Sequence, residues 1–398
     1  MLKRYLEDLI RADALSQRKI AFISGPRQIG KSTLALNMIG AENQSSDYFN
    51  WDDVEFKKIW ATNPKFLLES RINHTVIFDE IHKDFQWKSK LKGIYDLYKN
   101  KNHFIVTGSA RLNFYRKSGD SLQGRYFPYS LHPFSYGEIP HLKPPPEKEW
   151  RSESLPVSPF RLSDLEVLGG FPDSILVGSE EKAQRWRNLY RERLVQEDIR
   201  DFSEIKMISQ VDLLSLLLQD RVGAQLSYES LRRDLNASYE SILTWIDALE
   251  NIFYCFRIRP YSNKLNNMIR KEPKLYLRDW SFLKSPATRW ENMVACHLLK
   301  NVNAWTEAAM GNFALFYLRD KQKREVDFFI TKNEKPFLLL EVKSNSHSIS
   351  PALEYYAQKL KPEFAIQLVR EKRVPTSAVI KTSPVQLMSA EEFFGVLN

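Results

Sequence analysis

Cysteine is scarce in this chain, with only Cys255 and Cys296 among its 398 residues. Their spacing forms neither a disulfide framework nor a thiolate metal site, which argues against a disulfide-stapled secreted domain. We therefore expect two buried thiols in a protein of the reducing cytoplasm.

Long apolar segments are also absent. No run approaches the roughly 20 apolar residues that a membrane-spanning helix needs. The first residues, MLKRYLEDLIRAD, place acids among apolar positions and predict an amphipathic helix rather than a signal peptide. We therefore expect no membrane partner.

The length of 398 residues predicts two or three domains, each with a core of its own. The proportions of 43% hydrophobic and 27% charged residues are ordinary for a globular protein. The net charge of +9 is compatible with a polyanion as partner, but many basic proteins bind no nucleic acid. Charge alone therefore leaves the partner open.

Short apolar strands alternate with helical stretches in residues 1–140, which predicts an α/β domain with a parallel sheet covered by helices. The expected strands are residues 19–24, 48–51, 75–78 and 103–107. A proline-rich linker is predicted at 141–160, a helical region at 161–270 and a second α/β domain at 271–398.

A glycine loop follows the first expected strand and precedes a helix, in the pattern G-x-x-x-x-G-K-[ST]. Backbone N–H groups of such a loop surround phosphates, and the helix N-terminus adds a favourable dipole. Lys31 is expected to reach the β- and γ-phosphates of ATP, and the Ser32 hydroxyl to complete a Mg²⁺ shell. The predicted nucleotide-binding residues are Gly25, Pro26, Arg27, Gln28, Ile29, Gly30, Lys31, Ser32 and Thr33.

Acidic and hydroxyl side chains end the later strands of this domain. Asp79 is expected to hold Mg²⁺ through water, and Glu80 to polarise the attacking water. Thr107 and Ser109 could sense the γ-phosphate, although a simple turn at the strand end explains them equally well. The sequence thus predicts ATP binding and hydrolysis.

Two arginines are candidates for stabilising charge at the γ-phosphate, in cis or from a neighbouring subunit. They are Arg111 and Arg125, and Arg125 is preferred because it opens an aromatic segment expected to pack on the core. A solvated surface arginine is the alternative for both.

The pattern R-E-V-D, followed by E-V-K, has the layout of a metal-dependent nuclease core. Alternation along a strand places Glu341 and Lys343 on one face, and Asp327 can reach them through a hairpin turn at 332–336. Asp327 and Glu341 are then expected to coordinate Mg²⁺, with Lys343 orienting water. Glu291 is a second-tier ligand, and Glu325 competes with Asp327 for the inward position. Surface salt bridges explain the same pattern.

The middle region has the outline of a winged helix: helix, turn, helix and β-ribbon. Ser238 is the expected N-cap of the second helix, whose exposed face would offer Tyr239, Glu240, Ser241 and Thr244. None of these four residues is basic. The positive charge that a phosphate-contacting surface requires lies nearby, at Arg232, Arg233, Arg257, Arg259 and Lys264. Docking of a protein partner is the alternative.

Several segments together resemble one family. These are GPRQIGKST, VIFDEIH, VTGS, GRYFPYSLHPFSYGE, GGFP at 169–172 and QEDI at 196–199. They are similar to AAA-type (AAA+ superfamily) ATP-binding proteins of bacteria and archaea that carry a poorly characterised C-terminal domain. The resemblance implies a P-loop ATPase core, a winged-helix-like middle and a C-terminal fold of the restriction-endonuclease-like PD-(D/E)XK kind. A homo-oligomer is compatible with the resemblance, because AAA-type cores commonly close their sites with a neighbour's arginine, but the sequence does not give the oligomeric state.

Two hypotheses follow for the whole chain. The first is an ATP-driven switch or motor-like ATPase whose C-terminal module engages DNA and cuts it with Mg²⁺. The second is an ATP-gated interaction protein, in which the nuclease-like module is an inactive scaffold for a protein partner.

Overall fold

The computed structural model describes residues 2–40, 44–71, 73–109, 122–138, 142–147, 149–150, 158–202, 207–262, 271–345, 348–370 and 384–397. The chain divides into two compact units. Unit 1 comprises residues 1–132, 139–142 and 251–253, and unit 2 comprises residues 133–138, 143–250 and 254–398. Within the described stretches no helix is long and apolar enough to cross a membrane.

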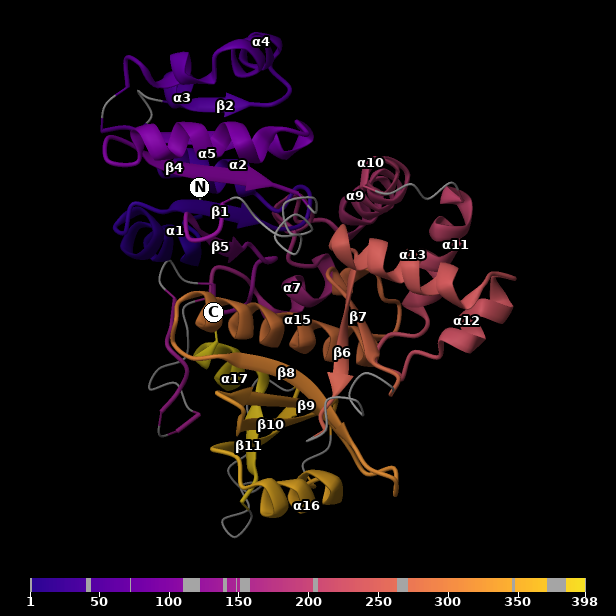
Figure 1. The fold of residues 1–398 in the computed structure, drawn as a ribbon. Coiled ribbons are helices and arrows are strands. Elements are labelled where there is room, and N and C mark those ends of the chain that lie inside the picture. Colours follow the sequence, from indigo (N-terminus) through magenta and orange to yellow (C-terminus); the bar gives the residue numbers. More distant parts are fainter. Residues whose placement is uncertain are drawn as a thin grey trace. The chain divides into compact units, whose positions relative to one another are not determined.

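Unit 1 is built on a parallel sheet of five strands in the order β2-β3-β4-β1-β5 (Figure 1). The strands are β1 (Ile20–Ser24), β2 (Tyr48–Asn50), β3 (Thr75–Asp79), β4 (His103–Gly108) and β5 (Tyr126–Ser130). The parallel sheet predicted from the sequence is confirmed, and β5 lies in the aromatic segment that we expected only to pack on the core.

Helices cover both faces of this sheet. They are α1 (Tyr5–Ile10), η1 (Arg11–Leu15), α2 (Lys31–Asn37), α3 (Gln44–Asp47), α4 (Val54–Thr62), η3 (Pro64–Leu68), η4 (Ile81–Lys83) and α5 (Trp87–Tyr98). Neighbouring residues of one strand point to opposite faces, and both Phe22 and Ile23 of β1 are buried. The sheet therefore needs cover on both sides, as parallel sheets usually have.

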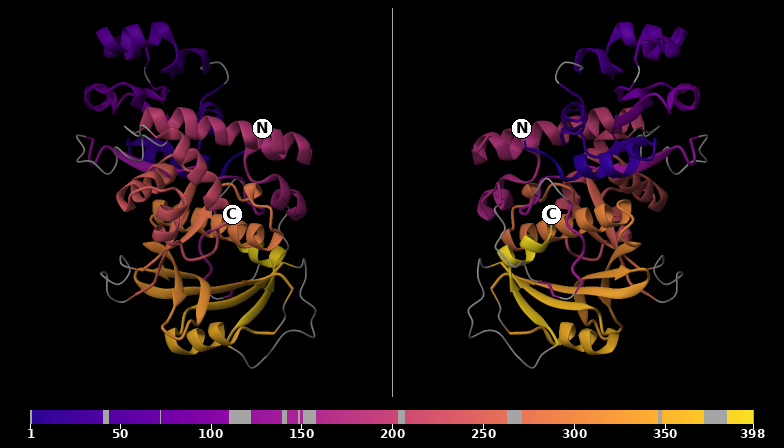
Figure 2. Two further views of the ribbon diagram at one scale, coloured as in Figure 1. Left: turned by 90° about the vertical axis from the view of Figure 1, so that its right-hand side faces the viewer. Right: turned by 90° about the vertical axis from the view of Figure 1, so that its left-hand side faces the viewer.

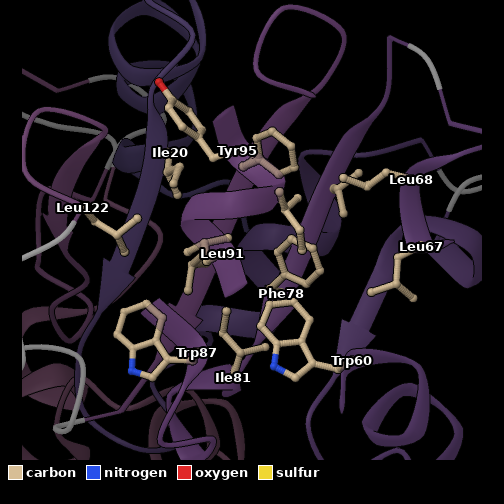
Figure 3. Packing of buried hydrophobic residues seen from close by; sticks show 14 of the residues in the cluster. Ile20, Trp60, Leu67, Leu68, Phe78, Ile81, Trp87, Leu91, Tyr95 and Leu122 are labelled. Atoms are coloured by element: carbon tan, nitrogen blue, oxygen red, sulfur yellow. The ribbon is translucent and has the colours of Figure 1, made fainter. Parts of the chain in front are cut away.

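Aromatic side chains fill the core on one face of the sheet (Figure 3). Trp60 of α4 lies against Phe78 of β3, with ring centroids 5.3 Å apart, and Trp87 of α5 lies against Phe22 at 5.8 Å. Rings of this size each bury a large apolar area, so this cluster fixes α4 and α5 to the sheet. The strand ends that carry polar residues are thereby held in place.

Unit 2 begins its described part with helices. They are α7 (Leu162–Leu168), α8 (Pro172–Leu176), α9 (Glu180–Arg193), η5 (Leu194–Asp198), α10 (Ile199–Phe202), α11 (Ile208–Gln219), α12 (Tyr228–Asp234) and α13 (Tyr239–Asn251). Ser238 caps α13, because its Oγ accepts a hydrogen bond from the Ser241 N–H at 3.0 Å. The predicted N-cap is confirmed.

The rest of unit 2 is a mixed sheet of seven strands in the order β12-β11-β10-β9-β8-β6-β7. The strands are β6 (Cys255–Pro260), β7 (Lys274–Leu277), β8 (Phe313–Arg319), β9 (Glu325–Lys332), β10 (Lys335–Lys343), β11 (Phe364–Val369) and β12 (Gln386–Ser389). The expected β-ribbon, β6 and β7, is antiparallel and joins this sheet through β8. Both predicted thiols, Cys255 and Cys296, are buried and free.

Helices of unit 2 also pack on this sheet: α15 (Pro286–Glu307) on β7 and β8, and α16 (Pro351–Leu360) on β9, β10 and β11 (Figure 2). Each begins with a serine N-cap followed by proline, Ser285-Pro286 and Ser350-Pro351. Two shorter helices are η6 (Trp280–Phe282) and α17 (Ala390–Val396).

The hairpin between β9 and β10 turns through Asn333 and Glu334, which have φ values of 50° and 66°. This left-handed pair is typical of a tight two-residue turn, and it confirms the pairing predicted for the acidic motif.

Candidate functional site

The glycine loop lies at the carboxyl end of β1, where the strand order of the sheet reverses. The chain leaves β1 for β2 at one edge and leaves β4 for β5 at the other, although β1 and β4 are neighbours. Ligands of open parallel sheets bind at such points, outside the carboxyl ends of the strands. The fold therefore puts the loop where a nucleotide is expected.

The backbone of this loop depends on its glycines. Gly30 has a φ of 93°, in the left-handed region, immediately before α2. At Gly25 there is no room for a side chain, because an added Cβ would lie 2.4 Å from the backbone oxygen of Leu131. Gln28 also has a positive φ, 60°, without being glycine. These constraints explain why the motif needs glycine at its two ends.

Lys31 folds back into its own loop. Its Nζ donates hydrogen bonds to the carbonyl oxygens of Pro26, at 2.7 Å, and Gly25, at 3.1 Å. The side chain is buried, with only 7% of its surface exposed. The ammonium group is therefore already inside the loop that phosphates are expected to occupy.

Asp79 ends β3 beside this loop and is surrounded by hydroxyl groups. The Ser32 Oγ donates to Asp79 Oδ2 at 2.7 Å, the Tyr48 hydroxyl donates to the same oxygen, and Thr107 donates to Oδ1. Asp79 and Thr107 are register partners in the sheet. A carboxylate and a hydroxyl in contact are oxygen donors of the kind that Mg²⁺ prefers, so the residues present fit this ion.

Tyr48, on β2, is a site residue that the sequence interpretation missed. Burial, and then the hydrogen bond to Asp79, raise the pKa of Tyr48 to about 12. The phenol therefore remains a donor at neutral pH. No motif could have indicated it, since Tyr48 lies 31 residues before its partner in the sequence.

Glu80 follows Asp79 with a φ of 58°, which is uncommon for a non-glycine residue. Its N–H donates to the Thr107 carbonyl at 3.0 Å, and its carboxylate lies 3.4 Å from Nε2 of His82. The positive φ turns the chain sharply at the end of β3. Glu80 is thus held directly beside Asp79 with a partly exposed side chain.

The other predicted residues of unit 1 take different positions. Thr33 is exposed on α2, and Ser109 directly follows β4. Arg125 precedes β5, where its carbonyl accepts from the N–H of Ile20 at the start of β1. The loop follows the other end of β1, about 16 Å away at ~3.3 Å per residue. Arg125 instead pairs with Asp96 at 2.9 Å, and Arg111 lies outside the described residues.

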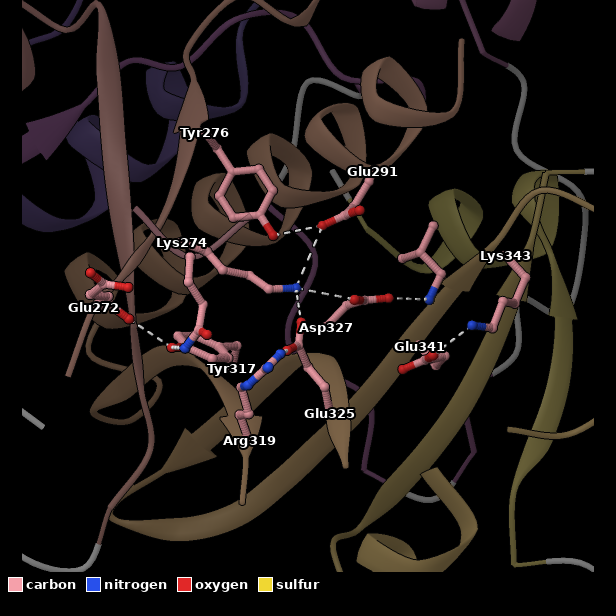
Figure 4. Close-up of polar contacts among 12 residues, drawn as sticks. Glu272, Lys274, Tyr276, Glu291, Tyr317, Arg319, Glu325, Asp327, Glu341 and Lys343 are labelled. Carbon is pink, nitrogen blue, oxygen red and sulfur yellow. Dashed lines mark hydrogen bonds and ion pairs between the residues drawn. The ribbon is translucent and has the colours of Figure 1, made fainter. Parts of the chain in front are cut away.

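The acidic motif of unit 2 comes together around the β9–β10 hairpin (Figure 4). Asp327 Oδ2 accepts from the Val342 N–H at 3.0 Å, so the two strands are joined at the motif. Lys343 Nζ donates to Glu341 Oε1 at 2.7 Å, as expected for side chains on one face. Glu341 Oε2 is buried and has no hydrogen-bond partner within the described part of the chain.

Lys274 of β7, which the sequence interpretation did not include, extends into this motif. Its Nζ lies 2.6 Å from Glu325, 3.3 Å from Asp327 and 3.9 Å from Glu291 of α15. Burial alone disfavours an ammonium, but the surrounding carboxylates raise the pKa of Lys274 above its usual range. Both candidates for the inward acid, Glu325 and Asp327, thus face the same lysine.

Two glutamates of this acidic cluster, which comprises Glu291, Glu325, Asp327 and Glu341, have a raised pKa. Burial, and then the charge of Asp327, raise the pKa of Glu291 to about 7 and that of Glu341 to about 7. The Tyr276 hydroxyl donates to Glu291 Oε1 at 2.8 Å. Asp327 is therefore held close to two other acids as well as to Lys274.

The acidic cluster does not fit a divalent ion as it stands. Among the residues that the structure describes, no three His, Cys, Asp or Glu side chains are grouped as metal ligands. Both oxygens of Asp327 already accept hydrogen bonds, one from Lys274 and one from the Val342 N–H. An ion at Asp327 would therefore have to compete with the Lys274 ammonium for the same carboxylate.

The expected phosphate-contacting surface of unit 2 is partly neutralised within the unit. Arg257 pairs with Asp247 and Glu250, and Arg232 pairs with Glu229 at 2.8 Å. Arg233 and Arg259 are exposed, and Lys264 lies outside the described residues. Of the predicted helix face, Tyr239 is 44% exposed.

Three family models match successive parts of the chain. Residues 17–140 match a model described as "AAA domain". Residues 160–290 and 288–387 match two domains of unknown function, DUF8612 and DUF4143. The first match, with the glycine loop and the parallel sheet, identifies residues 17–140 as an AAA-type P-loop ATPase domain.

Curated relatives are uncharacterised proteins. One from Mycobacterium tuberculosis is 21% identical over 405 residues, covering 97% of this chain and 85% of the relative. One from Haemophilus influenzae is 22% identical over 386 residues, covering 89% and 94%. Among solved structures, AMPPCP-bound DnaA from Aquifex aeolicus aligns with a TM-score of 0.29 and 14% identity, covering 62% of this chain and 86% of that one.

Proposed function

We propose that the chain binds ATP with Mg²⁺ at the glycine loop of unit 1 and hydrolyses it. The observation that carries the proposal is the contact between Ser32 and Asp79, 2.7 Å apart beside the buried Lys31. A hydroxyl from the loop and an acid from β3 are the pair that holds the metal in P-loop ATPases. The AAA-domain match over the same residues supports this proposal.

Each residue then has a distinct task. The loop N–H groups and Lys31 bind the phosphates, and Ser32 and Asp79 hold Mg²⁺, which neutralises phosphate charge. Glu80 polarises the attacking water, and its fixed position next to Asp79 keeps it near that water. Thr107 keeps Asp79 in place through its hydrogen bond, which leaves Ser109 as the candidate for sensing the γ-phosphate.

The arginine that completes the site comes from a second copy in this proposal. Arg125 cannot reach the loop of its own chain, since it lies at the far end of β1. A homo-oligomer would bring a neighbour's arginine to the γ-phosphate. ATP turnover per chain should then rise with protein concentration. If Arg125 is the arginine that the neighbour supplies, Arg125→Ala should remove that rise.

Steady-state ATP turnover of the full chain tests the main proposal. Lys31→Ala should lower turnover to background, while Lys65→Ala, a change of an exposed lysine on η3, should leave it unchanged. Turnover that survives Lys31→Ala would contradict the assignment of the site.

For unit 2 we propose a restriction-endonuclease-like module. The support is its element order: α15, the antiparallel strands β8, β9 and β10, then α16, and then β11 parallel to β10. Asp327, Glu341 and Lys343 lie together on this frame. Whether it cuts DNA with Mg²⁺, or only binds a DNA or protein partner, is decided by a cleavage assay on duplex and single-stranded DNA, with and without ATP.

In that assay cleavage should depend on Asp327 and Lys343 if the module is a nuclease. Asp327→Ala and Lys343→Ala would then abolish cleavage, whereas Asn345→Ala, at an exposed position just after β10, serves as the control. Absence of cleavage under all metal conditions favours the binding scaffold. The contacts of Lys274 give a reason to expect this second outcome.

A further inference from the structure

Lys274 takes a position inside the acidic cluster of unit 2 that no motif assigns. It comes from β7, whereas the acids come from β9, β10 and α15. Its side chain is 3% exposed and reaches Glu325, Asp327 and Glu291 at 2.6, 3.3 and 3.9 Å (Figure 4). One ammonium group thus faces three carboxylates.

The position of this lysine is built by its surroundings. β7 pairs with β6, which fixes the backbone, and the Lys274 Nζ lies 5.6 Å from the centroid of the Tyr317 ring. The Tyr317 hydroxyl donates to the Glu272 carbonyl at 2.7 Å, which holds the ring. A buried lysine with this support is part of the fold rather than a surface side chain that happens to reach inward.

The charge balance indicates what Lys274 replaces. Four carboxylates, Glu291, Glu325, Asp327 and Glu341, face Lys274, Lys343 and Arg319. In a nuclease core of this kind the motif lysine, Lys343 here, is the expected side-chain cation, and a divalent ion supplies the remaining positive charge. Lys274 and Arg319 together bring that same charge from the chain itself.

The ligand oxygens are occupied as well. Glu325 gives one oxygen to Lys274 and the other to Arg319, and Asp327 gives one to Lys274 and the other to the Val342 N–H. Glu341 gives Oε1 to Lys343, and its Oε2 is buried and accepts no hydrogen bond within the described residues, so every other oxygen of these three acids already has a donor. Mg²⁺ usually uses one or two carboxylates together with water, so an ion here would have to compete with Lys274 and Arg319 for the same acids.

We propose that Lys274 is the resident cation of the acidic cluster and that it excludes a divalent metal ion from Asp327 and Glu341. Unit 2 then keeps its acidic cluster ordered without metal, and acts on its partner by binding rather than by metal-dependent cleavage. The inference concerns unit 2 alone and goes beyond the ATPase activity proposed for unit 1.

Binding of Mn²⁺ to the full chain tests the proposal. Electron paramagnetic resonance measures the concentration of free Mn²⁺, and the bound amount is the difference from the total. All proteins carry Asp79→Asn and no nucleotide is added, so that the site of unit 1 does not contribute. The parent is the chain that carries only Asp79→Asn. Adding Asp327→Asn to it should leave the amount of bound Mn²⁺ unchanged. Lys274→Met should gain a site that binds Mn²⁺ at least about tenfold more tightly than any background binding by the parent, because metal affinity follows the charge and number of free oxygen ligands.

The matched control is Lys271→Met, which removes the same charge from an exposed lysine nearby and should gain no site. Adding Asp327→Asn to Lys274→Met should abolish the gained site. Lys274→Met leaves the carboxylates buried without their cation, and the variant could fail to fold for that reason. A double variant, Lys274→Met with Glu325→Gln, removes one negative charge as well and is made in parallel. Circular dichroism checks that both variants fold.

Two results would overturn the proposal. The first is that the parent binds Mn²⁺ and loses this binding with Asp327→Asn. The metal would then bind while Lys274 is still in place. The second is a folded Lys274→Met chain that gains no site. Neither result bears on ATP turnover, which is measured with Asp79 intact and depends on Lys31.

Discussion

Two aspartates in this chain, each near one end of its strand, are held by different kinds of donor. Asp79, at the end of β3, accepts from the hydroxyls of Ser32, Tyr48 and Thr107. Asp327, near the start of β9, accepts from the ammonium of Lys274 and the N–H of Val342. Hydroxyl groups orient a carboxylate and leave its charge available to a cation, whereas an ammonium group neutralises it.

On our proposals, this difference separates a site that would accept a metal from a site that already has its cation in Lys274. Neutral donors can be rearranged when an ion binds, at a moderate energetic cost. A buried ammonium paired with several carboxylates is much harder to displace, because either partner left alone would be an uncompensated buried charge. Motifs that look equally acidic in sequence therefore predict different chemistry once their partners are known.

The largest effect is expected in unit 1, from Glu80→Gln. This change keeps the size of the side chain but removes the base, so ATP turnover should fall by about 10²–10⁴-fold. Binding of a fluorescent ATP analogue should be retained, because the loop and Asp79 are intact. A parallel loss of binding and turnover would show that Glu80 supports the loop rather than the water.

In unit 2 the largest effect is expected from Lys274→Met, on stability. Removing one partner of a buried ionic cluster typically costs about 3–5 kcal/mol in free energy of unfolding. Urea unfolding of the wild type and the variant measures the difference, with the exposed Lys271→Met as control. A loss similar to that of the control would mean that Lys274 contributes no more than a surface lysine.

The pH dependence of stability should also come from unit 2. The pKa of Glu291 is raised to about 7 in the folded chain, so the folded state holds a proton that the unfolded state has released. The contribution of Glu291 to stability is therefore most favourable below its ordinary pKa, near 4, and declines as pH rises to about 7. Above about pH 7 the contribution of Glu291 to stability stays constant.

Glu291→Gln removes this titration and keeps an oxygen that can accept from Tyr276. The difference in melting temperature between Glu291→Gln and the wild type should thus favour the variant more at about pH 8 than at about pH 5. The exposed Glu240→Gln is the control, for which no such trend is expected. An opposite trend would mean that the charged form of Glu291 is the stabilised one.

The smallest effect is expected from Tyr48→Phe. It removes one of the hydroxyls that hold Asp79, a hydrogen bond worth about 0.5–1.5 kcal/mol, so turnover should fall by no more than about tenfold. The Mg²⁺ concentration for half-maximal turnover should change more than the KM for ATP, because Asp79 and not the phosphate loop loses a partner. An unchanged Mg²⁺ dependence would leave Tyr48 with a packing role only.

The sequence predicted the elements of unit 1 best, because there the motif, its strand and its helix are contiguous. The glycine loop between β1 and α2 needs only local geometry, and the acid that ends β3 is marked by the apolar strand before it. The pairing of β9 with β10 was predictable for the same reason, since only a short turn separates the strands. The exact ends of the strands and helices were less evident from the sequence, and so was β5 of unit 1.

The partners of the acids were not predictable in the same way. Lys274 lies 53 residues before Asp327, and Tyr48 lies 31 residues before Asp79, with no pattern to connect either pair. Arg125 was preferred from its neighbouring residues, but the direction of β5 places it at the end of the sheet away from the loop. Only strand order and register decide such distances.

The sequence by itself determined that this chain carries a phosphate loop, an acid-ended strand and an acidic hairpin, because each depends on residues a few positions apart. The tertiary structure decided which side chains each acid meets, because that depends on which distant elements lie beside it. Asp79 lies next to strands that bring hydroxyls, whereas Asp327 lies where β7 brings a lysine. On the two proposals made above, the same type of side chain would be open to a metal in one unit and closed to it in the other.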